Sequence, residues 1–295
     1  MNRIDILNQF LLGCRNGYAL GSFSPRNTVL IDAIVDAAKK KNSPVMVQIS
    51  SNEMRWFDIA PGVFAEAFRA STRGADVPVI LHLDHTYDYE MIVKAVEAGF
   101  DSVMIDGSKL PFEENVALTK KVVSYAHARD VAVEGELGNI GGTDKLETGG
   151  DSSLYTVPIQ AKEFVERTGV DTLAVSVGTA HGVYPTANPH IDFDRLEEIR
   201  DLIPDTPLVL HGGSGLPMET VRHAIRLDGK GGICKLNIAT DLELIFQQCL
   251  NVKRMPNAEV VKLDPAALAR AKAEVQAFVE DRMENFLFSA GKARQ

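Results

Sequence analysis

The amino-acid sequence predicts an α/β protein that folds as one domain. Eight short hydrophobic runs occur along the chain, and segments with apolar residues at helical spacing separate them. We find no linker, repeat or low-complexity stretch that would divide the 295 residues. Strands that alternate with helices over a chain of this length favour a (β/α)8 (TIM) barrel, a single domain, over an open doubly wound sheet.

Each hydrophobic run is nearly continuous, which is typical of parallel strands that are covered on both faces. The expected strands are Tyr18–Phe23, Val45–Ile49, Val79–Leu83, Ser102–Ile105, Ala132–Glu136, Thr172–Val177, Leu208–His211 and Ile233–Ile238. The sequence therefore provides the number of strands that a closed barrel of this class needs.

Helical patterns lie between these runs, and several have recognisable ends. Gly99 and Gly169 follow helical segments as left-handed caps, and Pro217 stands at the first position of another helix. The expected helices are Val29–Lys41, Tyr89–Ala98, Asn115–Arg129, Gln160–Thr168, Phe193–Leu202, Pro217–Leu227 and Pro265–Phe288. The first dozen residues form a short capping helix, so residues 1–295 make one barrel domain that ends in a long helix.

One long segment interrupts the pattern after the fifth expected strand. Asn139–Thr156 is rich in Gly, Thr, Asp and Ser, and it carries no periodic hydrophobic pattern. Long loops inside compact domains are usually functional. We therefore expect this segment to contribute to a site.

Charge and composition exclude some classes of protein. The net charge is −9, and the acidic residues are spread along the chain, whereas nucleic-acid binding needs a basic patch. No window approaches 18 consecutive apolar residues, so we expect no membrane span. A phosphorylated small molecule remains compatible with an acidic chain, because backbone dipoles hold phosphate locally.

The cysteines and the N-terminus point to the cytoplasm. Cys14, Cys234 and Cys249 are isolated, and we expect free thiols in a reducing compartment. The first five residues include Arg3 and Asp5, where a secretory segment would need apolar residues.

Polar residues gather at the carboxyl ends of six expected strands. The six runs are His82-Leu83-Asp84-His85, Asp106-Gly107-Ser108, Glu134-Gly135-Glu136, Gly178-Thr179-Ala180-His181-Gly182, His211-Gly212-Gly213-Ser214-Gly215 and Asn237-Ile238-Ala239-Thr240-Asp241. The carboxyl ends of barrel strands meet at one face, where active sites of this fold lie. Residues that are distant in sequence therefore converge there.

Three of these residues form a candidate metal site. His85, His181 and His211 would meet as neutral imidazoles, which are the ligands of an open catalytic zinc site. Strand alternation turns His82 into the barrel with Asp84, so a buried hydrogen-bonding role is expected for His82. The other histidines lie in helix or loop contexts and are expected to be solvated; they are His127, His190 and His223.

Two further carboxylates reach the same rim. Asp106 and Glu136 have three open roles: a second position of the metal, orientation of the histidines, or structural hydrogen bonds. The glycine-rich run from His211 to Gly215 and the run from Asn237 to Thr240 both lead into helices. Backbone N–H groups at such junctions can hold a phosphate.

These runs resemble those of the class II (metal-dependent) fructose/tagatose-bisphosphate aldolase family. The similarity covers nearly the whole chain and is densest from Val77 to Asp241. The similar runs, in order, are LHLDH, IDGS, ELGNIGG, VGTAHGVY, LVLHGGSGLP and ICKLNIATD. The resemblance implies a carbon–carbon lyase of carbohydrate metabolism, such as glycolysis, that is a homo-oligomer (dimer or tetramer). It would reversibly cleave a ketose (bis)phosphate, of the fructose- or tagatose-1,6-bisphosphate type, to dihydroxyacetone phosphate and an aldehyde.

The same resemblance implies roles for individual residues. One catalytic Zn²⁺ would be held by His85, His181 and His211, with Asp106 and Glu136 near a second or alternative metal position. Asp84 would exchange the C4 hydroxyl proton, and Asn237 would stabilise the enediolate. The positions that match phosphate-binding residues are Gly182, Gly212, Gly213, Ser214, Ala239 and Thr240.

The chain departs from that family at three places. Pro185 stands where a lysine is usual, and the nearest matches to a loop glutamate that exchanges the C1 proton are Asp144, our candidate, and Glu147. Asp228–Gly231 resembles an insertion on the face away from the chemistry. Another ketose 1-phosphate, or a non-catalytic sugar-phosphate-binding subunit, is therefore the alternative. A metal-dependent hydrolase is disfavoured because Ser22–Pro25 carries no His-x-His pair.

Overall fold

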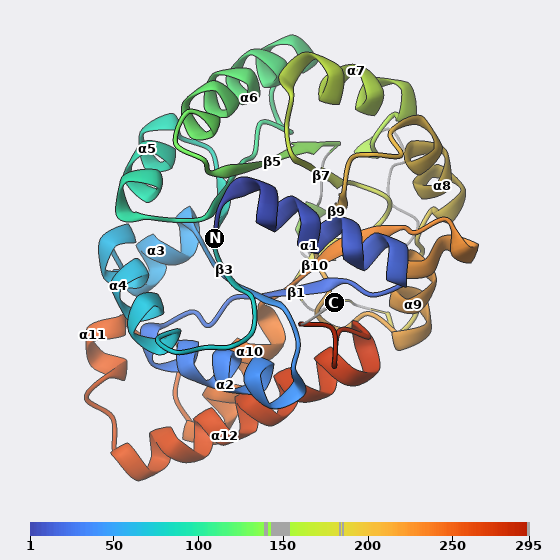
Figure 1. Ribbon diagram of the computed structural model, residues 1–295. Helices are drawn as coiled ribbons and strands as arrows, with labels where there is room; N and C mark the ends of the chain where they lie inside the picture. Colours follow the sequence, from blue (N-terminus) through green and yellow to red (C-terminus); the bar gives the residue numbers. More distant parts are fainter. Residues whose placement is uncertain (139–140, 143–153, 183, 185, 294–295) are drawn as a thin grey trace.

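Parallel strands close into a barrel in the computed structural model, which describes residues 1–138, 141–142, 154–182, 184 and 186–293. Within these ranges the order around the barrel is β1-β10-β9-β7-β5-β4-β3-β2, and helices surround it (Figure 1). The barrel strands are β1 Leu20–Phe23, β2 Val45–Ser50, β3 Val79–Thr86, β4 Ser102–Ile105, β5 Ala132–Leu137, β7 Thr172–Val175, β9 Leu208–Leu210 and β10 Ile233–Ile238. The predicted (β/α)8 barrel is confirmed, with every expected strand present.

The helices are α1 Arg3–Asn16, α2 Ile31–Lys41, α3 Ser51–Phe57, α4 Pro61–Ser71, α5 Tyr89–Ala98, α6 Phe112–His127, α7 Pro158–Thr168, α8 Phe193–Leu202, α9 Met218–Arg226, α10 Thr240–Leu250, α11 Asn257–Val260 and α12 Pro265–Asp281. Shorter helical turns are η1 Thr28–Leu30, η4 Leu227–Gly229 and the π-helical η5 Arg282–Phe286. A small second sheet pairs β6 Gly141–Gly142 with β8 Ala180–His181. None of the helices in the described ranges is both long and apolar enough to cross a membrane.

Helix ends follow the local sequence signals in most places. Gly99 and Gly169 have φ of 88° and 71°, the left-handed conformation that glycine adopts without a steric penalty. Pro217 is the residue before α9 rather than its first residue, so that prediction was wrong by one position. Helix α3 was not predicted, because it is only seven residues long and has too few turns to show a period.

Strand β3 is longer than the sequence indicated. Parallel pairing with β2 continues through Ser50 and Asp84, and β3 runs on to Thr86. Asp84 and His85 therefore lie on the strand itself: pairing with β2 holds Asp84, and His85 lies where the register with β4 shifts between Leu83 and Thr86.

Helix α1 covers the end of the barrel opposite the carboxyl ends of the strands (Figure 1). Ile6 and Phe10 of this helix are buried in a cluster with Tyr18, Leu20 and Met46. Removal of these apolar side chains from water holds the helix in place. The expected short capping helix is thus present.

Two of the three cysteines are joined, which corrects the prediction of free thiols. Cys14 and Cys234 form a disulfide between α1 and β10, with their Cα atoms 5.3 Å apart. The two residues are 220 positions apart in sequence, so only the docking of α1 on the barrel brings them together. Cys249 is free.

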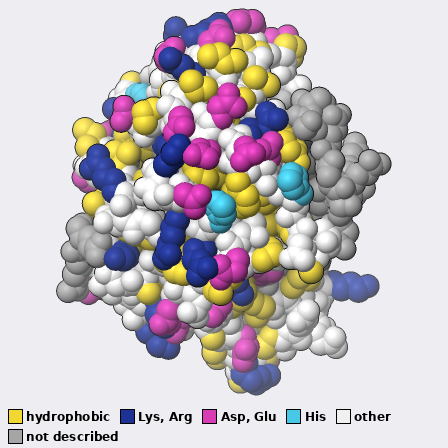
Figure 2. Space-filling view, turned by 90° about the vertical axis from the view of Figure 1, so that its right-hand side faces the viewer, with side chains coloured by type: hydrophobic (Ala, Val, Ile, Leu, Met, Phe, Trp, Pro, Cys, Tyr) yellow, Lys and Arg dark blue, Asp and Glu magenta, His cyan; other side chains and the backbone are white. Residues whose placement is uncertain are grey.

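The segment Asp228–Gly231 lies at the amino end of β10, away from the carboxyl ends of the strands. Its Lys230 forms ion pairs with Glu197 and Asp201 of α8. On the described part of the face in Figure 2, positive and negative side chains are interspersed. This face lacks the single-sign basic area that nucleic-acid binding requires.

Candidate active site

A cavity of about 620 Å³ opens at the carboxyl ends of the barrel strands. The sequence-predicted residues that line it are Asp84, His85, Asp106, Glu136, His181, Gly182, Gly212, Ser214, Asn237, Ala239 and Thr240. Gly213 is not among the residues that line it. Asp144, Glu147 and Pro185 lie outside the described residues. The fold thus brings together side chains from six separate strand ends.

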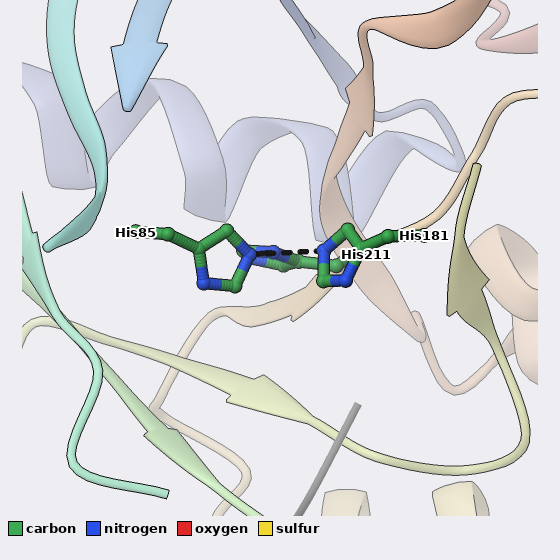
Figure 3. Close-up of side chains that lie close together, drawn as sticks. All are labelled: His85, His181 and His211. Carbon is green, nitrogen blue, oxygen red and sulfur yellow. Dashed lines mark hydrogen bonds between the residues drawn. The ribbon is translucent and has the colours of Figure 1, made fainter. Parts of the chain in front are cut away.

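Three imidazoles point toward one another (Figure 3): His85 and His181 line the cavity, and His211 is buried beside them. His85 comes from β3, His181 from β8, and His211 directly follows β9. Nε2 of His85 lies 2.9 Å from Nε2 of His181 and 2.7 Å from Nδ1 of His211. The sequence-predicted trio therefore converges on one point.

Neighbouring carboxylates fix which nitrogen of His85 and of His211 faces that point. Nδ1 of His85 lies 3.1 Å from Asp106, and Nε2 of His211 lies 2.9 Å from Glu134. A carboxylate accepts, so in neutral rings these nitrogens carry the hydrogen. The lone pairs of His85 Nε2 and His211 Nδ1 then face each other, and a proton or a bound cation at this point removes their repulsion. The donor set therefore fits a divalent metal such as zinc.

The pKa of His85 also indicates that positive charge is favoured at this point. Burial lowers the pKa of His85, but Asp84, Asp106 and Glu136 outweigh it and raise the pKa to about 10. For His181, burial and His85 lower the pKa to about 3. Carboxylates thus surround a point that attracts positive charge, whether a proton or a metal ion.

Asp106 and Glu136 differ in their surroundings. Asp106 accepts hydrogen bonds from the backbone and side chain of Ser108 while it contacts His85, so it orients that ring. Oε2 of Glu136 is buried, lies 3.7 Å from Nδ1 of His85 and has no hydrogen-bond partner among the described residues. Burial and Asp106 hold the pKa of Glu136 well above its usual range. His85, Asp106 and Glu136 form a second group that could hold a metal.

Asp84 lies beside the three histidines, but its carboxylate contacts Gln48 and Asn237 instead of the imidazoles. Its carboxylate accepts from Nε2 of Gln48 at 3.1 Å and from Nδ2 of Asn237 at 2.9 Å. Burial raises the pKa of this carboxyl, but His85, His211 and Lys235 outweigh it and lower the pKa to about 2. Asp84 is therefore an ionised acceptor whose carboxylate faces β2 and β10.

A buried network below the histidines was missed by sequence reasoning. Nζ of Lys235 donates to Glu134 at 2.7 Å and lies 3.1 Å from Nε2 of His82. His82 contacts Ser102 at 3.0 Å through Nδ1. His82 thus has the buried hydrogen-bonding role that was expected, and Lys235 supplies the cation for the carboxylates inside the barrel.

The glycine-rich loop after β9 has little room for side chains. Gly212 has φ of 68°, and a Cβ there would lie 2.2 Å from the carbonyl oxygen of Ala180. The hydroxyl of Tyr184 donates to the Gly212 carbonyl at 2.9 Å and fixes the loop. The N–H of Gly213 already donates to the Asn237 carbonyl, so the geometry leaves it no N–H to offer a ligand.

The same face carries the start of α10. Ala239 precedes this helix without a side-chain cap, and Ser214 accepts a hydrogen bond from the backbone of Asp241 at 3.3 Å. Ser214, Ala239 and Thr240 all line the cavity. A helix start with a hydroxyl beside it is suited to an anion such as phosphate.

The remaining histidines lie elsewhere. His127 contacts Asp171 at 2.8 Å and is only partly exposed, so the expectation that it is simply solvated was wrong. His223 is exposed and stacks on Phe193.

Comparison with known proteins agrees with this geometry. The family model described as fructose-bisphosphate aldolase class-II matches residues 7–292. The YdjI aldolase from Escherichia coli K12 is 32% identical, with a TM-score of 0.82 and coverage of 98% of this chain and 99% of that one. A Coccidioides immitis protein assigned as a fructose-1,6-biphosphate aldolase is 30% identical, with a TM-score of 0.83 and coverage of 99% and 98%.

The fold extends to more distant structures. The fructose-bisphosphate aldolase of Campylobacter jejuni is 24% identical, with a TM-score of 0.76 and coverage of 97% of this chain and 95% of that one. Together, the barrel, the convergent histidines and the family match over nearly the whole chain lead to one conclusion. The chain is an aldolase that belongs to the class II fructose-bisphosphate aldolase family.

Proposed function

We propose that this aldolase reversibly cleaves a ketose phosphate to dihydroxyacetone phosphate and an aldehyde, with zinc as its metal. The observation that supports this proposal is the position of Asp84 beside three imidazoles whose ring nitrogens converge. Substrates of the fructose- or tagatose-1,6-bisphosphate type and other ketose 1-phosphates both fit this reaction.

His85, His181 and His211 would hold one catalytic zinc ion, and Asp106 with Glu136 and His85 would form a second or alternative position. When bound, the metal supplies a Lewis acid that withdraws electron density from the ketose carbonyl. The unpartnered Oε2 of Glu136 supports the alternative position, because a buried carboxylate oxygen without a partner is costly.

Asp84 is the acid/base in this scheme. Ionised and held by Gln48 and Asn237, it takes the C4 hydroxyl proton during cleavage and returns it during condensation. Asn237 bridges Asp84 and His211, so its amide can donate to the oxygen that gains negative charge as the enediolate forms.

The phosphate of the substrate would lie at the loops after β9 and β10. Gly182, Gly212, Ser214, Ala239 and Thr240 line the cavity there. Gly213 would contribute by letting the loop approach Asn237 closely, since its own N–H is already used. For proton exchange at C1, Asp144 remains the candidate and Glu147 the alternative.

A coupled assay for dihydroxyacetone phosphate over a panel of ketose phosphates, with metal content determined on the same sample, tests the proposal. A chelator should abolish activity and zinc should restore it. Borohydride added with substrate should trap no lysine adduct. Activity that persists after complete metal removal would sink the zinc mechanism, and metal-loaded protein without carbon–carbon cleavage would favour a sugar-phosphate-binding subunit.

The setting of the reaction is part of the same proposal. The enzyme would act in the cytoplasm, in carbohydrate metabolism such as glycolysis, as a homodimer or homotetramer. Size-exclusion chromatography with light scattering tests the assembly.

A further inference from the structure

One wall of the cavity is built from four alternating charges. NH1 of Arg26 lies 2.8 Å from Oε1 of Glu53, and its Nε lies 3.5 Å from Oε2 of Glu243. Arg254 contacts both oxygens of Glu243, at 2.7 and 2.9 Å, and stacks 4.6 Å from the Trp56 ring centre. These residues all line the cavity, and we call them the charged wall.

The charged wall is fixed before any ligand arrives. Arg26 is buried and has φ of 62°, a left-handed conformation that costs a residue with a Cβ about 1–2 kcal/mol. Oε2 of Glu53 accepts a hydrogen bond from the backbone N–H of Ser50, and the Ser50 hydroxyl accepts one from the backbone N–H of Glu53. Both ends of this ion-pair chain are therefore anchored, one in the backbone and one on an aromatic ring.

The formal charges of the charged wall cancel. Glu53 and Glu243 balance Arg26 and Arg254, and Glu243 is shared between both guanidinium groups. Nε of Arg26 is buried beside Glu243 and makes no hydrogen bond among the described residues, so it is not exposed to a ligand. A neutral surface of paired guanidinium and carboxylate groups suits hydroxyl groups better than a second phosphate.

The order of the strands indicates which part of a substrate meets this wall. The proposed metal ligands come from β3, from β8 and from the residue after β9, and the start of α10 follows β10. Asp84 faces Gln48 on β2 and Asn237 on β10, not β4. Because the proposed acid/base faces that way, the part of the ketose beyond C4 extends over β1 and β2, where Arg26 and Glu53 stand.

We infer that the charged wall selects an uncharged, polyhydroxylated aldehyde half, so that the enzyme prefers a ketose 1-phosphate over the matching 1,6-bisphosphate. This inference rests on the proposed function and narrows its substrate class. A second phosphate would have to break an existing ion pair before an arginine could bind it.

Lys109 is a lysine in the cavity outside the charged wall. It is exposed, and its ammonium lies 5.4 Å from the Tyr87 ring centre on the β4 side. An exposed ammonium attracts an anion weakly because water and salt screen it. It also lies on the side of the cavity that Asp84 does not face.

The test is run in the condensation direction, where the two aldehydes differ only in their phosphate. Dihydroxyacetone phosphate is offered with D-glyceraldehyde or with D-glyceraldehyde 3-phosphate, and kcat/KM is measured for each aldehyde. The wild-type enzyme should use D-glyceraldehyde with the larger kcat/KM. No condensation with either aldehyde, and no cleavage of any ketose phosphate, would count against the proposed function itself.

A larger kcat/KM for the phosphorylated aldehyde would overturn the inference and leave the aldolase intact. Loss of that preference in Lys109→Met would then identify Lys109 as the anchor for the second phosphate.

Glu243→Gln tests the charge balance directly. It keeps the shape of the side chain and leaves the charged wall with one excess positive charge, so the ratio of kcat/KM should shift toward the phosphorylated aldehyde by about tenfold or more. Glu219→Gln removes the same charge from an exposed pair with Arg222 and should leave the ratio unchanged. A ratio that is equal in both variants contradicts the inference.

Arg254→Gln provides the opposite change if Glu243→Gln fails to fold. Arg254 is 43% exposed, so its replacement is well tolerated by the fold. The charged wall then carries one excess negative charge. The ratio of kcat/KM for the phosphorylated aldehyde to kcat/KM for D-glyceraldehyde should therefore fall about fivefold or more below the wild-type ratio. A ratio that stays the same or rises counts against the inference.

Discussion

Oε1 of Glu134 lies 2.9 Å from Nε2 of His211, and this contact determines which nitrogen of His211 faces the other two imidazoles. The ring presents Nδ1 to His85 rather than Nε2. Glu134 is itself held by Lys235 at 2.7 Å. The orientation of one metal-site histidine thus depends on a charge that is buried deep in the barrel.

Glu134→Gln should weaken metal binding by about 10–100-fold, because the amide orients His211 less strongly and lowers its basicity. Competition with a chelator of known affinity, at fixed pH, measures the change. Glu163→Gln, at an exposed pair with Arg167, is the control and should bind metal like the wild type. Equal metal affinity in the two variants would show that Glu134 does not orient the histidine.

Asp84→Asn should retain the metal and lower kcat by about 10²–10⁴-fold, because the isosteric amide cannot accept the C4 hydroxyl proton. Metal content and turnover are measured on the same preparation. Full activity with bound metal would mean that another group is the acid/base.

Lys235→Met should destabilise the fold by about 3–5 kcal/mol, because it leaves Glu134 buried without its cation. Urea denaturation measures the loss in free energy of unfolding. The double variant Lys235→Met/Glu134→Gln should recover part of it, since no uncompensated charge remains. Equal stabilities of the single and double variants would show that the ion pair is not the cause.

Gly212→Ala should raise KM for the sugar phosphate and cost about 1–3 kcal/mol of stability, because its Cβ would collide with the Ala180 carbonyl at a positive φ. Steady-state kinetics and thermal unfolding report the two effects. Gly62→Ala in α4 is the matched control: no atom lies within 4 Å of the added Cβ, and stability should rise slightly. Unchanged kinetics in Gly212→Ala would remove this loop from the phosphate site.

Most of the fold could be predicted because the strands are near-continuous hydrophobic runs and most of the longer helices show a helical period; α3 and α4 were not predicted. The site followed from the same property: Asp84, His85 and His211 stand at the ends of such strands, and a barrel brings strand ends together. Local sequence therefore contained the information that positions the candidate metal site.

Long-range contacts inside and below the barrel could not be predicted in this way. Lys235 and Glu134 come from β10 and β5, which are not neighbours in the barrel, so no pairing pattern links them. Cys14 reaches Cys234 only through the docking of α1. A sequence shows that such residues exist, but their partners depend on how the barrel closes.

The charged wall was missed for a different reason. Arg26 lies in a loop, Glu53 in an unpredicted short helix and Arg254 beyond the end of α10. Each residue has the local appearance of a solvated surface charge. Their mutual neutralisation appears only when the three segments are placed side by side.

Glu53 caps the start of α3 and also forms the ion pair with Arg26. Because one side chain makes both contacts, substitutions at this position are constrained. A mutation at Glu53 that admits a new aldehyde also removes a capping box from the helix. The contacts that Arg254 makes are with the side chains of Glu243 and Trp56 and do not cap a helix. Selection for new aldehydes in the laboratory should therefore accumulate changes at Arg254 first and leave Glu53 in place, so a helix start limits the accessible range of substrates.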